Sequence, residues 1–157
     1  MTLSKAERQF HRRTAVNCFN KAWDLLDKKG RTSDEDREML LLGHASRYHW
    51  GLVGKPENRA VGDWQLARIY GELGQGSQAL LFARASLSTC RTNNLKEILH
   101  TAYEGVARAY AVTGDSKNAK YFLGRARRHL SRLQLDKEDR KVYSDQVLDT
   151  QRMIDRL

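Results

Sequence analysis

The strongest constraint on the fold is an internal repeat with a constant offset of 40 residues. The tetrapeptide Ala67-Arg68-Ile69-Tyr70 recurs as Ala107-Arg108-Ala109-Tyr110, and further positions recur at the same offset. The matched pairs are Leu66/Val106, Ala67/Ala107, Arg68/Arg108, Tyr70/Tyr110, Gly74/Gly114, Ala79/Ala119 and Phe82/Phe122. Because the matches share one offset without a gap, the chain contains two copies of one supersecondary unit.

The repeated unit is helical, since apolar residues recur with a period near 3.6 and strand-like alternation is not evident. Capping signals and glycines divide the chain into seven expected helices, at about residues 4–30, 32–54, 57–73, 77–92, 94–114, 115–135 and 136–157. The short connections predict antiparallel neighbours.

Two local patterns refine this division into helices. Asn94 followed by Glu97 is a typical capping pair, so the fifth helix is expected to begin there. The second helix carries a stripe of apolar residues that is expected to face the core: Leu41, Ala45, Tyr48 and Leu52.

The repeated motif resembles the tetratricopeptide repeat (TPR), a helix–turn–helix unit with conserved small and aromatic positions. The second copy matches it at Tyr103, Val106, Ala107, Tyr110, Gly114, Ala119, Leu123 and Ala126. The first copy matches it at Leu66, Ala67, Tyr70, Gly74, Ala79, Ala83 and Ser86, with Trp64 displaced by one position. Two departures are a period longer than the usual value of about 34 residues and a missing proline between repeats.

The resemblance implies an all-α, TPR-like right-handed α-solenoid of about three helix pairs plus a C-terminal capping helix. A single domain would then span residues 1–157, with repeats at about 60–92 and 100–132, a degenerate pair at 4–54 and a cap at 136–157. The segment His44–Trp50 together with Trp64 also resembles small stand-alone, uncharacterised bacterial repeat proteins, which suggests a bacterial origin.

The positive charge is unevenly distributed. The chain has 28 Lys+Arg against 19 Asp+Glu, a formal net charge of +9. The excess lies in the first, fourth and sixth expected helices, and the resemblance places the fourth and sixth on the convex side. The sixth helix contributes a basic face of Lys117, Lys120, Arg125, Arg127, Arg128 and Arg132. This face is either an ordinary solvated surface or a surface for an anionic partner.

The sequence contains no recognisable catalytic or cofactor motif. Nucleotide-binding loops, nucleophile elbows and zinc-protease motifs are absent, and the five histidines are scattered. We therefore expect a protein that is not an enzyme and has no cofactor or metal site. The charged N-terminus lacks a signal-peptide pattern and no apolar run is long enough for a membrane span, so a cytoplasmic location is expected.

Two arginines are the leading candidates for ligand contacts. The resemblance places Arg68 and Arg108 on the concave groove, where they would form a short cationic ladder suited to carboxylates. The alternative is local pairing with Glu72 and Glu104, one helical turn away in each case. The full set of predicted groove residues is Arg68, Arg108, Trp64, Tyr48 and Glu104.

A second candidate is the segment around residues 44–50. It concentrates polar and aromatic side chains and is either part of the core or a small-ligand pocket formed by His44, Arg47, His49 and Trp50.

The function predicted from the sequence is protein–protein interaction, with a peptide or partner protein bound in the concave groove. The alternatives are an anion- or nucleic-acid-binding accessory protein that uses the basic convex face, and the small-ligand pocket. Partner identity, self-association and whether the last helix fills the groove stay open at this stage.

Overall fold

A computed structural model describes residues 2–157, which form seven helices and no strand within that range. The helices are α1 (Lys5–Asp27), α2 (Ser33–Val53), α3 (Pro56–Glu72), α4 (Gly76–Thr92), α5 (Leu99–Val112), α6 (Ser116–Ser131) and α7 (Lys137–Asp155). The prediction of an all-α chain is confirmed. In these described residues, no helix is long and apolar enough to cross a membrane.

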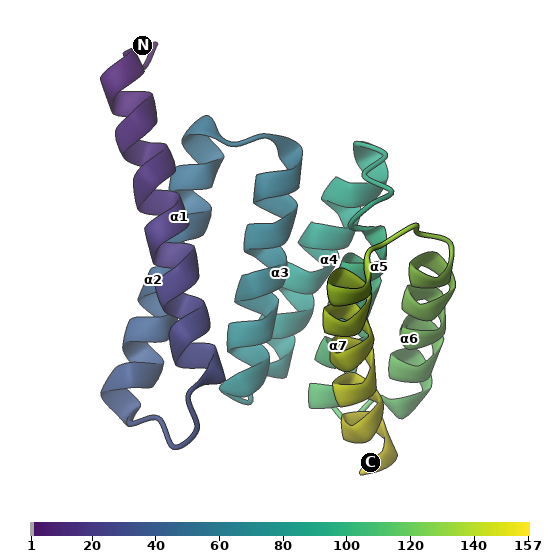
Figure 1. The fold of residues 1–157 in the computed structure, drawn as a ribbon. Helices are drawn as coiled ribbons and strands as arrows, with labels where there is room; N and C mark the ends of the chain where they lie inside the picture. The colour runs from purple at the N-terminus through teal and green to yellow at the C-terminus, as the bar shows by residue number, and fades with distance from the viewer. Residues whose placement is uncertain (1) are drawn as a thin grey trace.

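Neighbouring helices pack as antiparallel pairs, α1 with α2, α3 with α4 and α5 with α6 (Figure 1). The odd-numbered helices also contact one another along the chain, because α3 packs on α1 and α5, and α5 packs on α7. We call the surface of α1, α3, α5 and α7 the odd-helix face, and that of α2, α4 and α6 the even-helix face. In Figure 1, α1, α3 and α7 lie on the side nearest the viewer.

Helix α5 is the centre of the molecule, with α3, α4, α6 and α7 packed around it. Every residue from His100 to Ala109 is buried. Small residues permit this close packing: a Cβ atom added to Gly105 would lie 2.7 Å from the Trp64 ring. The last helix, α7, packs against α5 and α6.

The turns follow from local chemistry. Gly74 and Gly114, which are equivalent in the two repeats, adopt φ values of +71° and +81° at the ends of α3 and α5. This left-handed conformation favours glycine because other residues carry a Cβ atom that crowds the backbone there.

The predicted start of α5 is wrong. Asn94 adopts the left-handed conformation at φ 54° and takes part in the turn that ends α4, where the Leu95 amide donates to the Cys90 carbonyl at 2.9 Å. Asparagine tolerates this conformation better than most residues, so it serves here to end one helix rather than to begin the next. Helix α5 begins five residues later, at Leu99.

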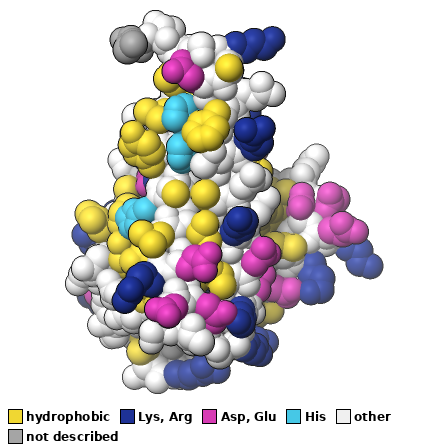
Figure 2. All heavy atoms as spheres, turned by 90° about the vertical axis from the view of Figure 1, so that its left-hand side faces the viewer, with side chains coloured by type: hydrophobic (Ala, Val, Ile, Leu, Met, Phe, Trp, Pro, Cys, Tyr) yellow, Lys and Arg dark blue, Asp and Glu magenta, His cyan; other side chains and the backbone are white. Residues whose placement is uncertain are grey.

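The predicted core stripe of α2 is also wrong. Leu41, Tyr48 and Leu52 are 64%, 65% and 42% exposed. The buried side of α2 instead carries Met39, Gly43 and Ser46. The small residues are there because the neighbouring helices approach closely: a Cβ atom on Gly43 would lie 2.6 Å from Ile69 of α3. Figure 2 shows hydrophobic and histidine side chains gathered on the outer face of this end of the molecule.

Candidate functional site

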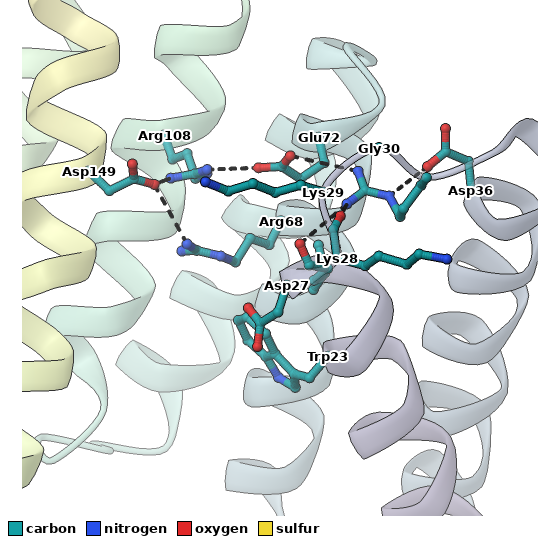
Figure 3. A pocket seen from close by; sticks show the side chains of 12 residues that line it. Trp23, Asp27, Lys28, Lys29, Gly30, Asp36, Arg68, Glu72, Arg108 and Asp149 are labelled. Atoms are coloured by element: carbon teal, nitrogen blue, oxygen red, sulfur yellow. Dashed lines mark hydrogen bonds and ion pairs between the residues drawn. The ribbon is translucent and has the colours of Figure 1, made fainter.

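The odd-helix face contains a pocket of about 490 Å³ between the C-terminal end of α1, the α1–α2 turn, α3, α5 and α7 (Figure 3). Its lining is mostly charged. It comprises Trp23, Leu26, Asp27, Lys28, Lys29, Gly30, Arg31, Asp36, Arg68, Glu72, Arg108 and Asp149. Segments far apart in the sequence therefore meet at one polar site.

The two repeat-equivalent arginines converge on Asp149 of α7. Arg108 Nη1 donates to Asp149 Oδ2 at 2.8 Å, and Arg68 Nη2 lies 3.9 Å from the same oxygen. Both guanidinium groups point toward this carboxylate in Figure 3. The convergence of Arg68 and Arg108 was predictable, whereas Asp149 lies outside the repeats and has no local sequence signal.

The arginines pair across helices rather than along them. Arg108 of α5 donates to Glu72 of α3 at 3.0 Å, and Arg68 of α3 lies 3.7 Å from Glu104 of α5. The local i,i+4 alternative considered from the sequence is therefore not the arrangement adopted. Because the pairs join different helices, they tie α3 to α5 as well as neutralising charge.

Glu104 is buried at 2% exposure and holds three helices together. Its carboxylate accepts from Trp64 Nε1 at 3.2 Å and from Thr150 Oγ1 of α7 at 2.6 Å. Glu104 and Trp64 were both predicted as groove residues, but both are buried, and they contact Arg68 on its inner side.

Arg68 and Arg108 differ in how well their charges are compensated. Burial alone would lower the pKa of Arg108, but Glu104, Asp149 and Glu72 outweigh it and raise the pKa. For Arg68, burial dominates and lowers the pKa despite the opposing carboxylates. The guanidinium carbon of Arg68 lies over the Trp23 and Trp64 rings, 5.6 Å from each ring centroid, which is a cation–π distance.

Arg68 also lacks direct hydrogen bonds to its acidic neighbours. Distances of 3.7 and 3.9 Å to Glu104 and Asp149 exceed the range of about 2.7–3.2 Å for N–H···O bonds. Its Nη1 atom is buried and has no hydrogen-bond partner within residues 2–157. Nη1 lies on the side of buried Glu104, whereas Nη2 lies on the side of half-exposed Asp149 in the pocket wall, so Nη2 is the nitrogen that an additional acceptor in the pocket would reach.

Tyr48 does not join the other predicted groove residues, because it lies on the exposed outer side of α2. The four predicted pocket residues also separate. His44 bonds to Tyr70 at 2.8 Å, Arg47 to Asp63 at 2.6 Å, and His49 to His11 at 2.7 Å. Trp50 lines a small apolar cavity of about 200 Å³ with residues of α1 and α3. Residues one to six positions apart on one helix thus contact different neighbours.

Five of the six basic residues predicted on the sixth helix lie on α6, and Arg132 is its C-cap residue. Arg127 faces α7, since it bonds to Gln151. Among the ion pairs formed within residues 2–157, none involves a lysine or arginine of α4 or α6. Arg125 and Arg127 bond instead to neutral partners, Tyr103 and Gln151. This face therefore keeps its positive charge uncompensated.

Comparisons with family models, with curated proteins and with solved structures give no match to this chain. Function must therefore be inferred from the two charged regions themselves.

Proposed function

We propose that the chain is a non-catalytic, TPR-like interaction module that binds an acidic segment of a partner protein in the pocket of the odd-helix face. The single observation that carries the proposal is Arg68, a buried guanidinium in the pocket wall without a hydrogen-bonded carboxylate in residues 2–157. A ligand carboxylate would hydrogen-bond to the Nη2 atom of Arg68, which lies 3.9 Å from Asp149 on the pocket side of the guanidinium.

The surroundings of Arg68 suit such a ligand. The Trp23 and Trp64 rings lie beside the guanidinium and restrict its movement, which reduces the conformational entropy lost on binding. Exposed Lys28 and Lys29 lie at the rim, where they would attract further acidic residues. The repeated helix pairs and the continuous row of odd-numbered helices support the TPR-like interpretation of the fold.

The carboxylate of Asp149 occupies the position beside Arg68 and Arg108 that a ligand carboxylate would take. It is 49% exposed, and it is held by Arg108 and approached by Arg68. An incoming carboxylate would compete with Asp149 for these two arginines, and this competition would restrict binding to segments with several acidic residues.

The test is titration of the protein with an N-acetylated hexaglutamate peptide, followed by the fluorescence of the tryptophans that flank Arg68. The Arg68→Gln variant should bind at least about tenfold more weakly, because hydrogen bonds to charged groups are lost. Arg37→Gln, on the exposed side of α2, removes the same charge and should bind like the wild type.

Arg68→Lys keeps the charge but not the planar fork, and it should also bind more weakly. Circular dichroism checks that each variant is folded. Equal affinity of wild type and Arg68→Gln, or no binding of hexaglutamate at millimolar concentration, would contradict the proposal.

A further inference from the structure

A second region has the features of a ligand site, and it lies on the opposite side of the molecule. Helices α4 and α6 each pack against α5 but not against one another within the described chain, so α5 forms the floor of a groove between them. One hollow of about 480 Å³ is lined by residues along one side of α4, and another of about 240 Å³ lies between α4, α5 and α6. Arg91 lines both.

The groove is basic and contains no counter-charge in its described lining. Acidic side chains are missing from both hollows, although the lining includes arginine, lysine and histidine. The basic lining residues are Arg84, Arg91, Lys96, Arg125 and His129. Burial lowers the pKa of His129, and the charges of Arg125, Arg132 and Arg128 add to this effect. Several positive charges therefore act on the same small region.

Aromatic residues of α5 orient the arginines of both walls. Arg125 of α6 lies 5.1 Å above the Tyr103 ring and donates to its hydroxyl at 3.0 Å. Arg84 of α4 lies 5.6 Å above the Tyr110 ring and donates to that hydroxyl. The Arg125 Nε atom is buried and has no hydrogen-bond partner in residues 2–157. Both side chains are thus fixed by neutral rings rather than neutralised by acids.

One side of α6 extends this arrangement along the groove. Tyr121, Arg125, Arg128 and Arg132 follow at intervals of four, three and four residues, which places them on one side of the helix. The stripe is about 16 Å long, which spans about five phosphates of one nucleic-acid strand at ~3.4 Å each. Tyr121 is 58% exposed and offers a ring face beside these charges.

We infer that the groove between α4 and α6 binds single-stranded nucleic acid, with arginines on the phosphates and a base stacked on Tyr121. Arginine is suited to phosphate because its planar fork donates two parallel hydrogen bonds. An exposed aromatic ring within a basic groove is the combination that binds single strands without sequence preference. This site is separate from the pocket of the odd-helix face, so the two proposals can fail independently.

The experiment measures the anisotropy of a fluorescein-labelled 12-nucleotide oligothymidine in 50 and 200 mM salt. About four phosphate contacts on a single strand predict roughly 50-fold weaker binding at the higher salt concentration. The triple variant Arg91→Gln/Arg128→Gln/Arg132→Gln should abolish most of this salt dependence, because it removes about three of those contacts.

The matched control is Lys5→Gln/Arg12→Gln/Arg13→Gln, which removes the same charge from exposed positions of α1. It should bind oligothymidine like the wild type. Tyr121→Ala should weaken binding at least about fivefold without changing the salt dependence, since stacking is not an ionic contact.

Four results would overturn the inference. The first is no binding of oligothymidine at 50 mM salt, and the second is an equal loss of affinity in the α1 control variant. The third is displacement of the oligonucleotide by hexaglutamate at equal charge concentration. The fourth is equally tight binding of a 12-base-pair duplex together with no effect of Tyr121→Ala on affinity. The third result would indicate an acidic protein partner, and the fourth would indicate binding to the phosphate backbone alone.

Discussion

Arginine has different roles on the two faces of this molecule. On the odd-helix face, Arg108 is 8% exposed and forms ion pairs with carboxylates from two other helices. On the even-helix face, Arg128 is exposed and makes no ion pair within residues 2–157. A buried charge must be paired because leaving water is costly, whereas an exposed charge stays solvated.

The comparison shows how charge is arranged differently on the two faces of a chain whose net charge is +9. The pocket of the odd-helix face is lined by acids as well as bases, so its charges largely cancel. The α4–α6 groove has no acidic residue in its described lining, so its positive electrostatic potential extends into solvent. The first region is therefore suited to a selective contact around one arginine, and the second to a polyanion.

The largest effect is expected from Glu104→Ala. This change removes a buried carboxylate that accepts from Trp64 and Thr150 and lies near Arg68. The free energy of unfolding, measured by urea denaturation, should fall by about 3–5 kcal/mol, because a buried charge loses its partner. Glu104→Gln keeps an acceptor and should cost less. A loss below about 1 kcal/mol for Glu104→Ala would contradict the claim that paired, buried charges on the odd-helix face stabilise the fold.

A pH titration tests whether unpaired charge is excluded from the interior. His100 is 2% exposed and packs edge-on against Tyr143, and burial lowers its pKa to about 4 from 6.5. Between these values the unfolded chain binds a proton that the folded chain does not. Stability should therefore fall as the pH drops from 6.5 to 4, by about 3 kcal/mol from this residue.

The matched variant for this titration is His100→Phe, which keeps an aromatic ring beside Tyr143. Its free energy of unfolding should lack the contribution of His100 between pH 6.5 and 4. An unchanged pH dependence in the variant would show that the histidine titrates normally in the fold.

Asp149→Asn should change stability and binding in opposite directions. Arg108 holds the pKa of Asp149 below its usual value despite burial, but the carboxylate is half-exposed, so its loss should cost only about 0.5–1 kcal/mol. Hexaglutamate should bind the variant more tightly, because the internal competitor for Arg68 and Arg108 is gone. Titration calorimetry measures the affinity, and weaker binding by the variant would contradict the role given to Asp149.

The smallest effect is expected from Arg128→Gln. An exposed side chain without an ion pair contributes little to the fold, so the free energy of unfolding should stay within about 0.5 kcal/mol of the wild type. Arg108→Gln, by comparison, should cost several-fold more in the same urea experiment. Similar losses of unfolding free energy in the two variants would contradict the claim that arginines stabilise the fold on the odd-helix face only.

The number and order of the helices were predictable because apolar residues recur with a helical period and glycines or capping residues separate the periodic segments. The positions of Arg68, Arg108, Glu104 and Trp64 near one another were predictable from the repeat, since equivalent residues of adjacent units lie side by side. That part of the site depends on sequence periodicity alone.

The remaining part depends on contacts between distant segments. Trp23 and Asp149 reach the pocket from helices outside the two clear repeats, and nothing near them in the sequence marks that role. The wrong prediction of which side of α2 is buried has a similar cause. The buried side of this helix contains the large Met39 but also Gly43 and Ser46, and a hydrophobic pattern does not identify small residues of this kind, which close packing requires.

The most direct test follows the arginine Nε–H signals of the ¹⁵N-labelled protein by NMR during titration with hexaglutamate. The Arg68 signal should shift in a saturable way, while the Arg128 signal should stay in place. A shift of Arg128 with Arg68 unchanged would contradict the proposed function, because the acidic segment would then bind the even-helix face.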